Sequence, residues 1–188
     1  MENEIISILN ESIKIKEDIK ELTPLIVKVS KEIIKAYRNK KKVVLFGNGG
    51  SAADAQHIAA EFVGKFYKDR ESLPALAFHT NTSVVTATAN DYGYDFIFER
   101  QVSSFVEAGD IAIGISTSGN SPNVIKGLVK AKEKGAITIG FTGQKENQTE
   151  KVVDYCLKMP STDTPRIQEG HITVGHIICY LVEKELFS

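Results

Sequence analysis

Tryptophan is absent from this 188-residue sequence, and cysteine and methionine occur only twice each. Two cysteines, Cys156 and Cys179, are too few for a disulfide framework, and apolar neighbours favour buried thiols at both positions. The N-terminus lacks the basic and apolar regions of a secretory signal. No stretch reaches the roughly 18 apolar residues of a membrane span. We therefore expect a cytoplasmic protein that does not engage a membrane.

An excess of charge of either sign is also missing, because 23 Lys and Arg stand against 24 Asp and Glu. No overall field therefore favours nucleic acid, and an anionic ligand must be held by local groups. The 42% hydrophobic and 25% charged residues are typical of a globular protein. The length predicts a single domain, which we divide into a helical extension, 1–41, and an α/β core, 42–188.

The order of apolar patterns predicts the fold. Residues 2–40 carry apolar side chains at helical spacing, which predicts two helices that are split near Thr23 and Pro24, with Thr23 as the cap of the second. From Lys42 onward, short β-rich runs alternate with helical segments, which predicts a five-stranded parallel sheet with helices on both faces, of the flavodoxin-like kind. The expected strands are 43–46, 75–79, 111–115, 137–141 and 155–159, and the later helices are 51–66, 82–90, 95–107, 121–134, 147–152 and 168–186.

A glycine-rich segment, Gly47–Ser51, follows the first expected strand and leads directly into a helix. Glycines allow close approach of a ligand to the backbone, and a helix N-terminus offers free N–H groups to an anion. The spacing formally matches a dinucleotide fingerprint. However, the next strand ends in Phe78-His79-Thr80, where that site needs an acidic residue, so a nicotinamide-dependent oxidoreductase is a weak alternative. For this loop alone, a tight turn without a ligand remains open.

A hydroxyl-rich segment, Ser116–Ser121, follows the third expected strand. We expect Ser121 to cap the next helix and Pro122 to occupy its first position. Such a turn can hold a phosphate without a lysine, and the sequence contains no nucleotide-binding G-x-x-x-x-G-K-[ST] motif. Serine-rich turns often bind nothing. The position at the carboxyl end of a strand, in the same sheet as the glycine loop, favours a phosphate site here.

Four further residues form a candidate acid–base or metal constellation. His57 and Glu61 are four residues apart, so they share one helix face, where they suit a metal or an acid–base pair. Gln168 and His176 are eight apart, about 12 Å along a helix, which is too far for one metal unless the side chains reach toward each other. Either Gln168 lies at an irregular helix start, or another subunit completes the site. We expect only structural roles for His171 and Glu169.

Taken together, five separated segments resemble the bacterial phosphoheptose isomerases, a family of the sugar isomerase (SIS) domain superfamily. The segments are Gly47–His57, Glu61, Asn90-Asp91, Ser116–Ser121 and Gln168–His176. They agree with the family in order and spacing, and the resemblance covers nearly the whole chain. It implies the conversion of sedoheptulose 7-phosphate into D-glycero-D-manno-heptose 7-phosphate through an enediol, the first step toward heptose units of lipopolysaccharide, capsule or related surface glycans. Sequence alone does not select among these glycans.

The resemblance also implies roles for individual residues. Glu61 and His176 would be the catalytic base and the opposing acid–base group, and one zinc ion per subunit would be bound by His57, Glu61, Gln168 and His176. The N-terminal helices would serve a homo-oligomer, as in the tetramers of the family. The expected substrate contacts are Asn48, Gly49, Gly50, Ser51, Glu61, Asn90, Asp91, Ser116, Thr117, Ser118, Ser121 and Gln168.

One alternative from another class remains at this stage. Some SIS domains are regulatory modules without catalysis, which bind a phosphosugar or the bacterial replication initiator. The presence of both Glu61 and His176 favours an enzyme. Turnover of a ketose 7-phosphate by protein with a stoichiometric metal would discriminate between the two.

Overall fold

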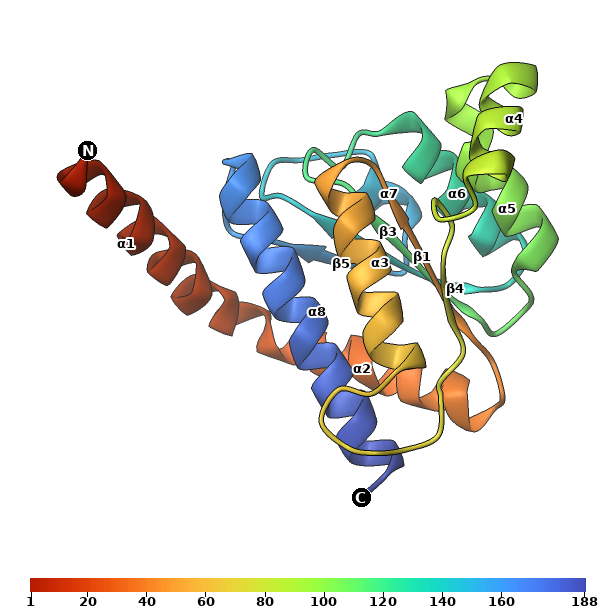
Figure 1. The fold of residues 1–188 in the computed structure, drawn as a ribbon, viewed down its shortest axis with the longest axis horizontal. Coiled ribbons are helices and arrows are strands. Elements are labelled where there is room, and N and C mark those ends of the chain that lie inside the picture. The colour runs from red at the N-terminus through yellow and green to blue at the C-terminus, as the bar shows by residue number, and fades with distance from the viewer.

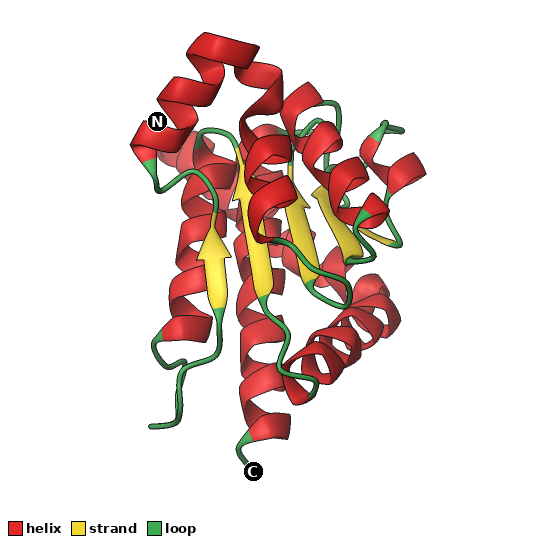
Figure 2. Cartoon of the chain, turned by 90° about the vertical axis from the view of Figure 1, so that its right-hand side faces the viewer, coloured by secondary structure: helices red, strands yellow, loops and turns green.

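A computed structural model describes residues 1–188 and contains one five-stranded sheet. All neighbouring strands are parallel, in the order β2-β1-β3-β4-β5, and Figure 2 shows them pointing in one direction. This is the strand order of flavodoxin-like folds, so the predicted sheet is confirmed. The strands are β1 Val43–Gly47, β2 Ala75–Ala77, β3 Ile111–Ile115, β4 Ile137–Thr142 and β5 Tyr155–Lys158.

Helices precede the sheet and connect its strands (Figure 1). Helix α1 extends away from the rest of the molecule, with the N-terminus at its far end. None of the helices is both long enough and apolar enough to cross a membrane. The helices are α1 Glu2–Asp18, α2 Thr23–Arg38, α3 Gly50–Val63, α4 Thr82–Tyr92, α5 Ile97–Phe105, α6 Pro122–Glu133, α7 Thr149–Val152 and α8 Thr164–Leu186, with short 3-10 turns η1 Ile19–Leu22 and η2 Tyr94–Phe96.

Two apolar layers enclose the sheet. Val43 and Leu45 of β1 face the layer shared by α2, α3 and α8, whereas Val44 and Phe46 face the layer of α5 and α6. Successive strand side chains point to opposite faces, so a strand that is covered on both faces must be apolar throughout. This requirement explains the unbroken apolar runs of β1 and β3, in which every residue is buried.

Several predicted boundaries differ from the structure. The second strand ends at Ala77 rather than His79, since Thr80 turns back to the carbonyl of Ala77. Thr23 lies inside α2, where its hydroxyl donates to the carbonyl of Lys20, so its predicted capping role is wrong. The helix expected at 51–66 ends at Val63, and the one expected at 95–107 is divided into η2 and α5.

The boundary that matters most for function is the start of α8. This helix begins at Thr164, four residues earlier than predicted, with Asp163 in an extended conformation at its N-cap. Pro165 lies in the first turn, where its missing N–H costs nothing because no intrahelical partner exists there. Gln168 consequently lies within the regular helix, which excludes the first of the two alternatives, an irregular helix start at this residue.

Candidate active site

The glycine and serine loops lie side by side at the carboxyl edge of the sheet. They follow β1 and β3, which are adjacent strands with Gly47 opposite Ile115. Gly49 and Gly119 have φ values of +55° and +64°, a region that other residues rarely adopt. The backbone therefore turns sharply in both loops, and both helices that follow, α3 and α6, begin at this edge.

The side chain of Ser116 contacts other hydroxyls of the serine loop. Its Oγ lies 2.9 Å from Ser121 Oγ and 3.4 Å from Ser118 Oγ, and it accepts a hydrogen bond of 3.1 Å from the N–H of Gly119. Ser121 occupies the predicted N-cap position of α6, but its side chain makes no capping hydrogen bond. Pro122 occupies the first position of α6, as expected.

A polar pocket opens beside the serine loop. Its volume is about 290 Å³, and its lining includes Thr117, Ser118, Lys145 and Ser161. Lys145 comes from the loop after β4, so the basic group is brought to the serines by the parallel order of the strands. The carboxylate of Glu146 also lines the pocket and balances the charge of Lys145, so the hydroxyls are the groups that suit a compact anion such as a phosphate.

Asn48 is held by a network that the sequence pattern did not predict. The backbone N–H of Val124 donates to Asn123 Oδ1 over 2.9 Å, which fixes which way the Asn123 amide points. Asn48 and Asn123 exchange two hydrogen bonds of 2.9 Å, and Tyr94 donates to Asn48 Oδ1 over 3.1 Å. Asn48 Oδ1 thus accepts two hydrogen bonds, and the second N–H of the Asn48 side-chain amide remains available to a ligand oxygen.

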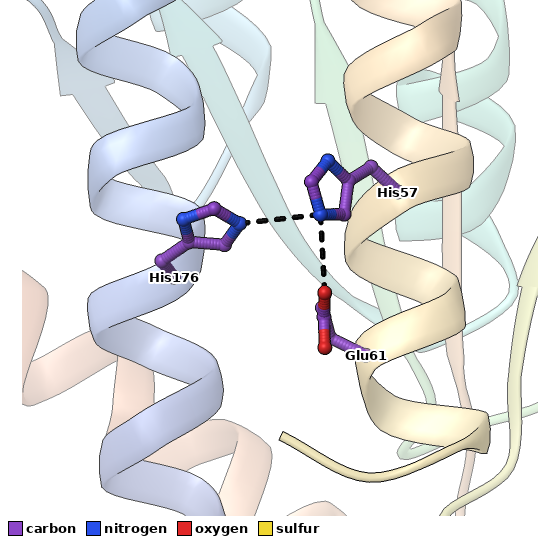
Figure 3. A group of neighbouring side chains, drawn as sticks. All are labelled: His57, Glu61 and His176. Carbon is purple, nitrogen blue, oxygen red and sulfur yellow. Dashed lines mark hydrogen bonds and ion pairs between the residues drawn. The ribbon is translucent and has the colours of Figure 1, made fainter. Parts of the chain in front are cut away.

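His57, Glu61 and His176 converge between α3 and α8 (Figure 3). One nitrogen or oxygen atom from each lies within 4.8 Å of the other two. His57 Nε2 is 3.0 Å from Glu61 Oε1 and 3.3 Å from His176 Nε2. The predicted pair on α3 therefore meets a histidine that lies 119 residues further along the chain than His57.

No arrangement of protons gives both contacts of His57 Nε2 a linear hydrogen bond of their own. An imidazole nitrogen carries either one proton or one lone pair, so Glu61 and His176 must share whichever His57 Nε2 offers. A cation placed among the three atoms would satisfy all of them at once. Two imidazoles and one carboxylate are donors that zinc accepts, which means that the residues present fit such an ion.

The carboxylate next to this cluster has an altered acidity. Asp54 precedes His57 by one helical turn on the same face of α3. One of its oxygens is buried without a hydrogen-bond partner. Burial raises the pKa of Asp54 to about 6, although His57 opposes the shift. A proton-binding group of near-neutral pKa thus adjoins the cluster, a signal that spacing alone did not reveal.

Gln168 lies about two turns of α8 away from the His57–Glu61–His176 cluster. It lies eight residues before His176 in regular α8, a rise of about 12 Å. Its side-chain amide lies directly against Gly50, so closely that a Cβ at that position would collide with it. Gln168 therefore borders the glycine loop, where the first turns of α3 and α8 meet.

The remaining predicted contacts differ in exposure. Ser51 is buried at the start of α3. Asn90 and Asp91 are exposed in the last turn of α4, where the Asn90 amide donates to the Asp91 carboxylate over 2.8 Å. His171 is fully buried and lies 3.2 Å from the carbonyl of Thr142, in keeping with its expected structural role.

Comparison with known proteins identifies the relatives of this chain. A family model described as "SIS domain" matches residues 9–143. A phosphoheptose isomerase from Aneurinibacillus thermoaerophilus is 53% identical over 100% of this chain and 96% of its own length. Phosphoheptose isomerase 2 from Campylobacter jejuni is 54% identical over 95% and 90%. The solved phosphoheptose isomerase from Neisseria gonorrhoeae superposes with a TM-score of 0.92 at 37% identity, covering 97% and 98% of the two chains.

Proposed function

This chain belongs to the SIS domain family and, within it, to the phosphoheptose isomerases, and from that premise we propose that it interconverts sedoheptulose 7-phosphate and D-glycero-D-manno-heptose 7-phosphate. The observation that carries the proposal is the convergence of Glu61 and His176 in one cluster, in a protein with a hydroxyl-lined pocket at the sheet edge. An aldose–ketose isomerisation needs an acid–base pair and an anchor for the phosphate. The SIS fold alone does not require an acid–base pair.

The serine loop binds the phosphate in this proposal. Ser116, Thr117, Ser118 and Ser121 offer hydroxyls, and the N-terminus of α6 offers backbone N–H groups and the positive end of its dipole. Lys145 adds a positively charged donor at the pocket, next to the carboxylate of Glu146. Asn48, whose free N–H is directed by Asn123, contacts a sugar oxygen, together with Gly49, Gly50, Ser51, Asn90, Asp91 and Gln168.

Glu61 and His176 move the protons. Glu61 removes a proton from C1 of the ketose, while His176 donates a proton to the C2 oxygen, which yields the enediol. Glu61 then returns a proton to C2 and His176 takes the proton of the C1 hydroxyl, leaving the aldehyde. The Glu61 side chain is 23% exposed, so a ligand can reach it, and its neighbour His57 is 48% exposed. Each group ends the cycle in its starting protonation state.

We propose zinc as the metal, one ion per subunit, bound by His57, Glu61 and His176, with Gln168 as a fourth ligand. When bound, zinc would polarise the substrate carbonyl and stabilise negative charge on oxygen. A carboxylate that is bound to a metal is a weaker base, so the role of Glu61 as a ligand would compete with its role as the base. The convergence of their side chains supports His57, Glu61 and His176 as ligands. Gln168 lies about 12 Å along α8 from His176, so its side chain would have to reach furthest to bind the same ion.

We further propose a homo-oligomer, a tetramer as in the family, that works in the cytoplasm and supplies heptose for a surface glycan. The support for assembly is α1, which projects from the body (Figure 1) and exposes five large apolar residues. A contiguous apolar surface of this kind marks an interface. The exposed residues are Ile5, Ile6, Ile8, Leu9 and Ile13.

An NMR time course with sedoheptulose 7-phosphate in D2O tests the function. Metal-stripped protein is compared with the same protein after addition of zinc, and Glu61→Gln serves as the control that retains the phosphate pocket. We expect the aldose 7-phosphate to appear with deuterium at C2, fastest with zinc, and no product from Glu61→Gln. If folded wild-type protein binds the sugar phosphate but neither forms aldose nor exchanges a sugar proton, it is a binding module and the proposal is wrong.

A further inference from the structure

A buried carboxylate on α8 accepts hydrogen bonds from the backbone of the loop that follows α3. Glu183 is 2% exposed, and its two oxygens accept backbone hydrogen bonds from Phe66, Tyr67 and Lys68, of 2.9, 2.8 and 3.0 Å. It also accepts a hydrogen bond of 3.0 Å from Arg70 Nε. Burial alone would raise the pKa of Glu183, but these amides and Arg70 outweigh it and hold the pKa below its usual value. The carboxylate is therefore charged and fully satisfied.

Arg70, which pairs with Glu183, binds the C-terminal end of helix α3. Arg70 Nη2 donates to the carbonyl of Glu61 and Nη1 to that of Phe62, each over 2.9 Å. These are carbonyls of the last helical turn, which lack partners within the helix. A guanidinium there is also favoured by the negative end of the helix dipole. The ion pair of Arg70 and Glu183 thus links the backbone of Glu61 on α3 directly to α8.

The same loop also packs against His176. The Phe66 ring lies 5.6 Å from the His176 ring, which in turn lies 4.9 Å from the His57 ring. The backbone N–H of Phe66 is one of the donors to Glu183. Glu183 follows His176 by two turns of α8. One carboxylate therefore holds both the end of the helix that carries Glu61 and the aromatic ring that packs on His176.

We propose that Arg70 and Glu183 are positioning residues, which hold α3 and α8 so that His57, Glu61 and His176 converge. This inference rests on the proposed function, because it assigns the pair to the same acid–base and metal cluster. A buried ion pair adds little net stability compared with apolar residues of the same size. Its contribution here is the relative placement of two helices whose side chains must meet within a few ångströms, where an error of about 1 Å can cost about 100-fold in rate.

Glu183→Gln tests the proposal against a matched control elsewhere in the sheet. Asp110 is also a fully buried carboxylate, which accepts backbone N–H bonds from Lys42 and Glu107 and pairs with the Lys42 ammonium. It precedes β3, at the edge of the sheet opposite the loops, so Asp110→Asn makes the same chemical change away from the site. Both variants and wild type are stripped of metal, and their zinc affinity is measured by competition with a chromogenic chelator.

We expect Glu183→Gln to bind zinc about 10-fold more weakly, the usual effect of losing a group that orients metal ligands. Its kcat should fall by about the same factor, whereas KM should stay near wild type, because the proposed phosphate contacts lie in the serine loop after β3, which Glu183 does not contact. Asp110→Asn should keep wild-type zinc affinity and kcat, whatever stability it loses. Equal effects of the two variants, or wild-type affinity and kcat in folded Glu183→Gln, would refute the proposal.

A second variant covers the case in which Glu183→Gln does not fold. Phe66→Leu keeps the backbone N–H bond to Glu183 and removes the ring that packs on His176, at a half-buried position. We expect a smaller loss of zinc affinity and kcat, in the same direction. Wild-type values for both would overturn the assignment. If wild-type protein itself does not isomerise the sugar phosphate, the proposed function fails, while the zinc titrations still decide whether the pair positions the cluster.

Discussion

Two histidines on α8, five residues apart, show how position decides what one residue type can do. His176 is partly accessible and faces His57, whereas His171 is fully buried and packs beside Phe141. Burial lowers the pKa of His171 to about 4, against the opposing effect of the carbonyl of Thr142. His171 is thus a neutral core residue at physiological pH, and only His176 is placed for proton transfer.

The shifted pKa of His171 predicts how stability depends on pH. The unfolded chain binds a proton near pH 6.5 and the folded chain only near pH 4, so the unfolded state holds more protons between these values. The stabilising effect of the neutral ring is complete above about pH 6.5 and is lost as the pH falls toward 4. At 1.36 kcal/mol per pKa unit it amounts to roughly 3 kcal/mol.

His171→Gln should therefore flatten the fall in unfolding free energy between about pH 6.5 and pH 4, since the glutamine amide does not titrate. Urea denaturation in EDTA, at one fixed protein concentration, measures it. His176→Gln is the control, because it removes an accessible imidazole from the same helix. The same slope in wild type and His171→Gln would contradict the assignment.

At the scale of elements, the contact between α3 and α8 determines whether a site exists. Gly175 directly precedes His176, and a Cβ at this position would lie 2.6 Å from Ile58 Cδ1 and 2.8 Å from Ile58 Cγ1. Ile58 is fully buried on α3, next to His57, so it has no room to rotate away. The two helices approach closely because one of them carries no side chain at the crossing.

Gly175→Ala should consequently push α8 away from α3. Overpacking of this kind costs about 1–3 kcal/mol, partly offset by the roughly 1 kcal/mol that alanine gains over glycine in a helix. We expect kcat to fall by a larger factor than stability alone explains, because His176 moves with the helix. Gly170→Ala is the matched control on α8, since its Cβ would also overpack, at 2.8 Å from Met159 Sδ and 3.3 Å from Ile19 Cδ1, but not against α3. Equal activity of the two folded variants would count against this account.

For the molecule as a whole, helix α1 carries apolar side chains that the fold of a single chain does not bury. Its last turn joins the main core through Ile15, whereas its first three turns expose apolar side chains to solvent. A monomer gains nothing from such a surface, but a second copy of the chain can bury it. The proposed oligomer therefore rests on the exposed apolar face of α1.

Replacing two residues of this face should disrupt the assembly without unfolding the protein. Ile5 and Leu9 are four apart and about half exposed, so Ile5→Lys with Leu9→Lys places two charges on one apolar face. Asn3→Lys with Asn10→Lys adds the same charge on the polar side of α1 and serves as control. Sedimentation should give an oligomer for wild type and control and a smaller mass for the apolar-face variant. A monomeric wild type, or an unchanged mass in that variant, would refute the oligomer proposal.

Local sequence determined the elements and half of the site. Alternating strands and helices follow from side-chain periodicity, which each segment carries independently of the rest. The glycine and serine loops share one edge because parallel strands must all end at the same side. His57 and Glu61 share a helix face because they are four residues apart. All of these features depend on neighbours in the chain, so they could be predicted from residue order.

Only the tertiary structure decided which distant groups meet. The approach of His176 to His57 depends on how closely α8 packs on α3, which Gly175 allows through contacts with Ile58. Arg70 and Glu183 are 113 positions apart in the sequence, and Asn48 and Asn123 are 75 apart. No spacing pattern predicts either contact. Such contacts arise from the packing of whole side chains, a property of the folded molecule that no segment carries alone.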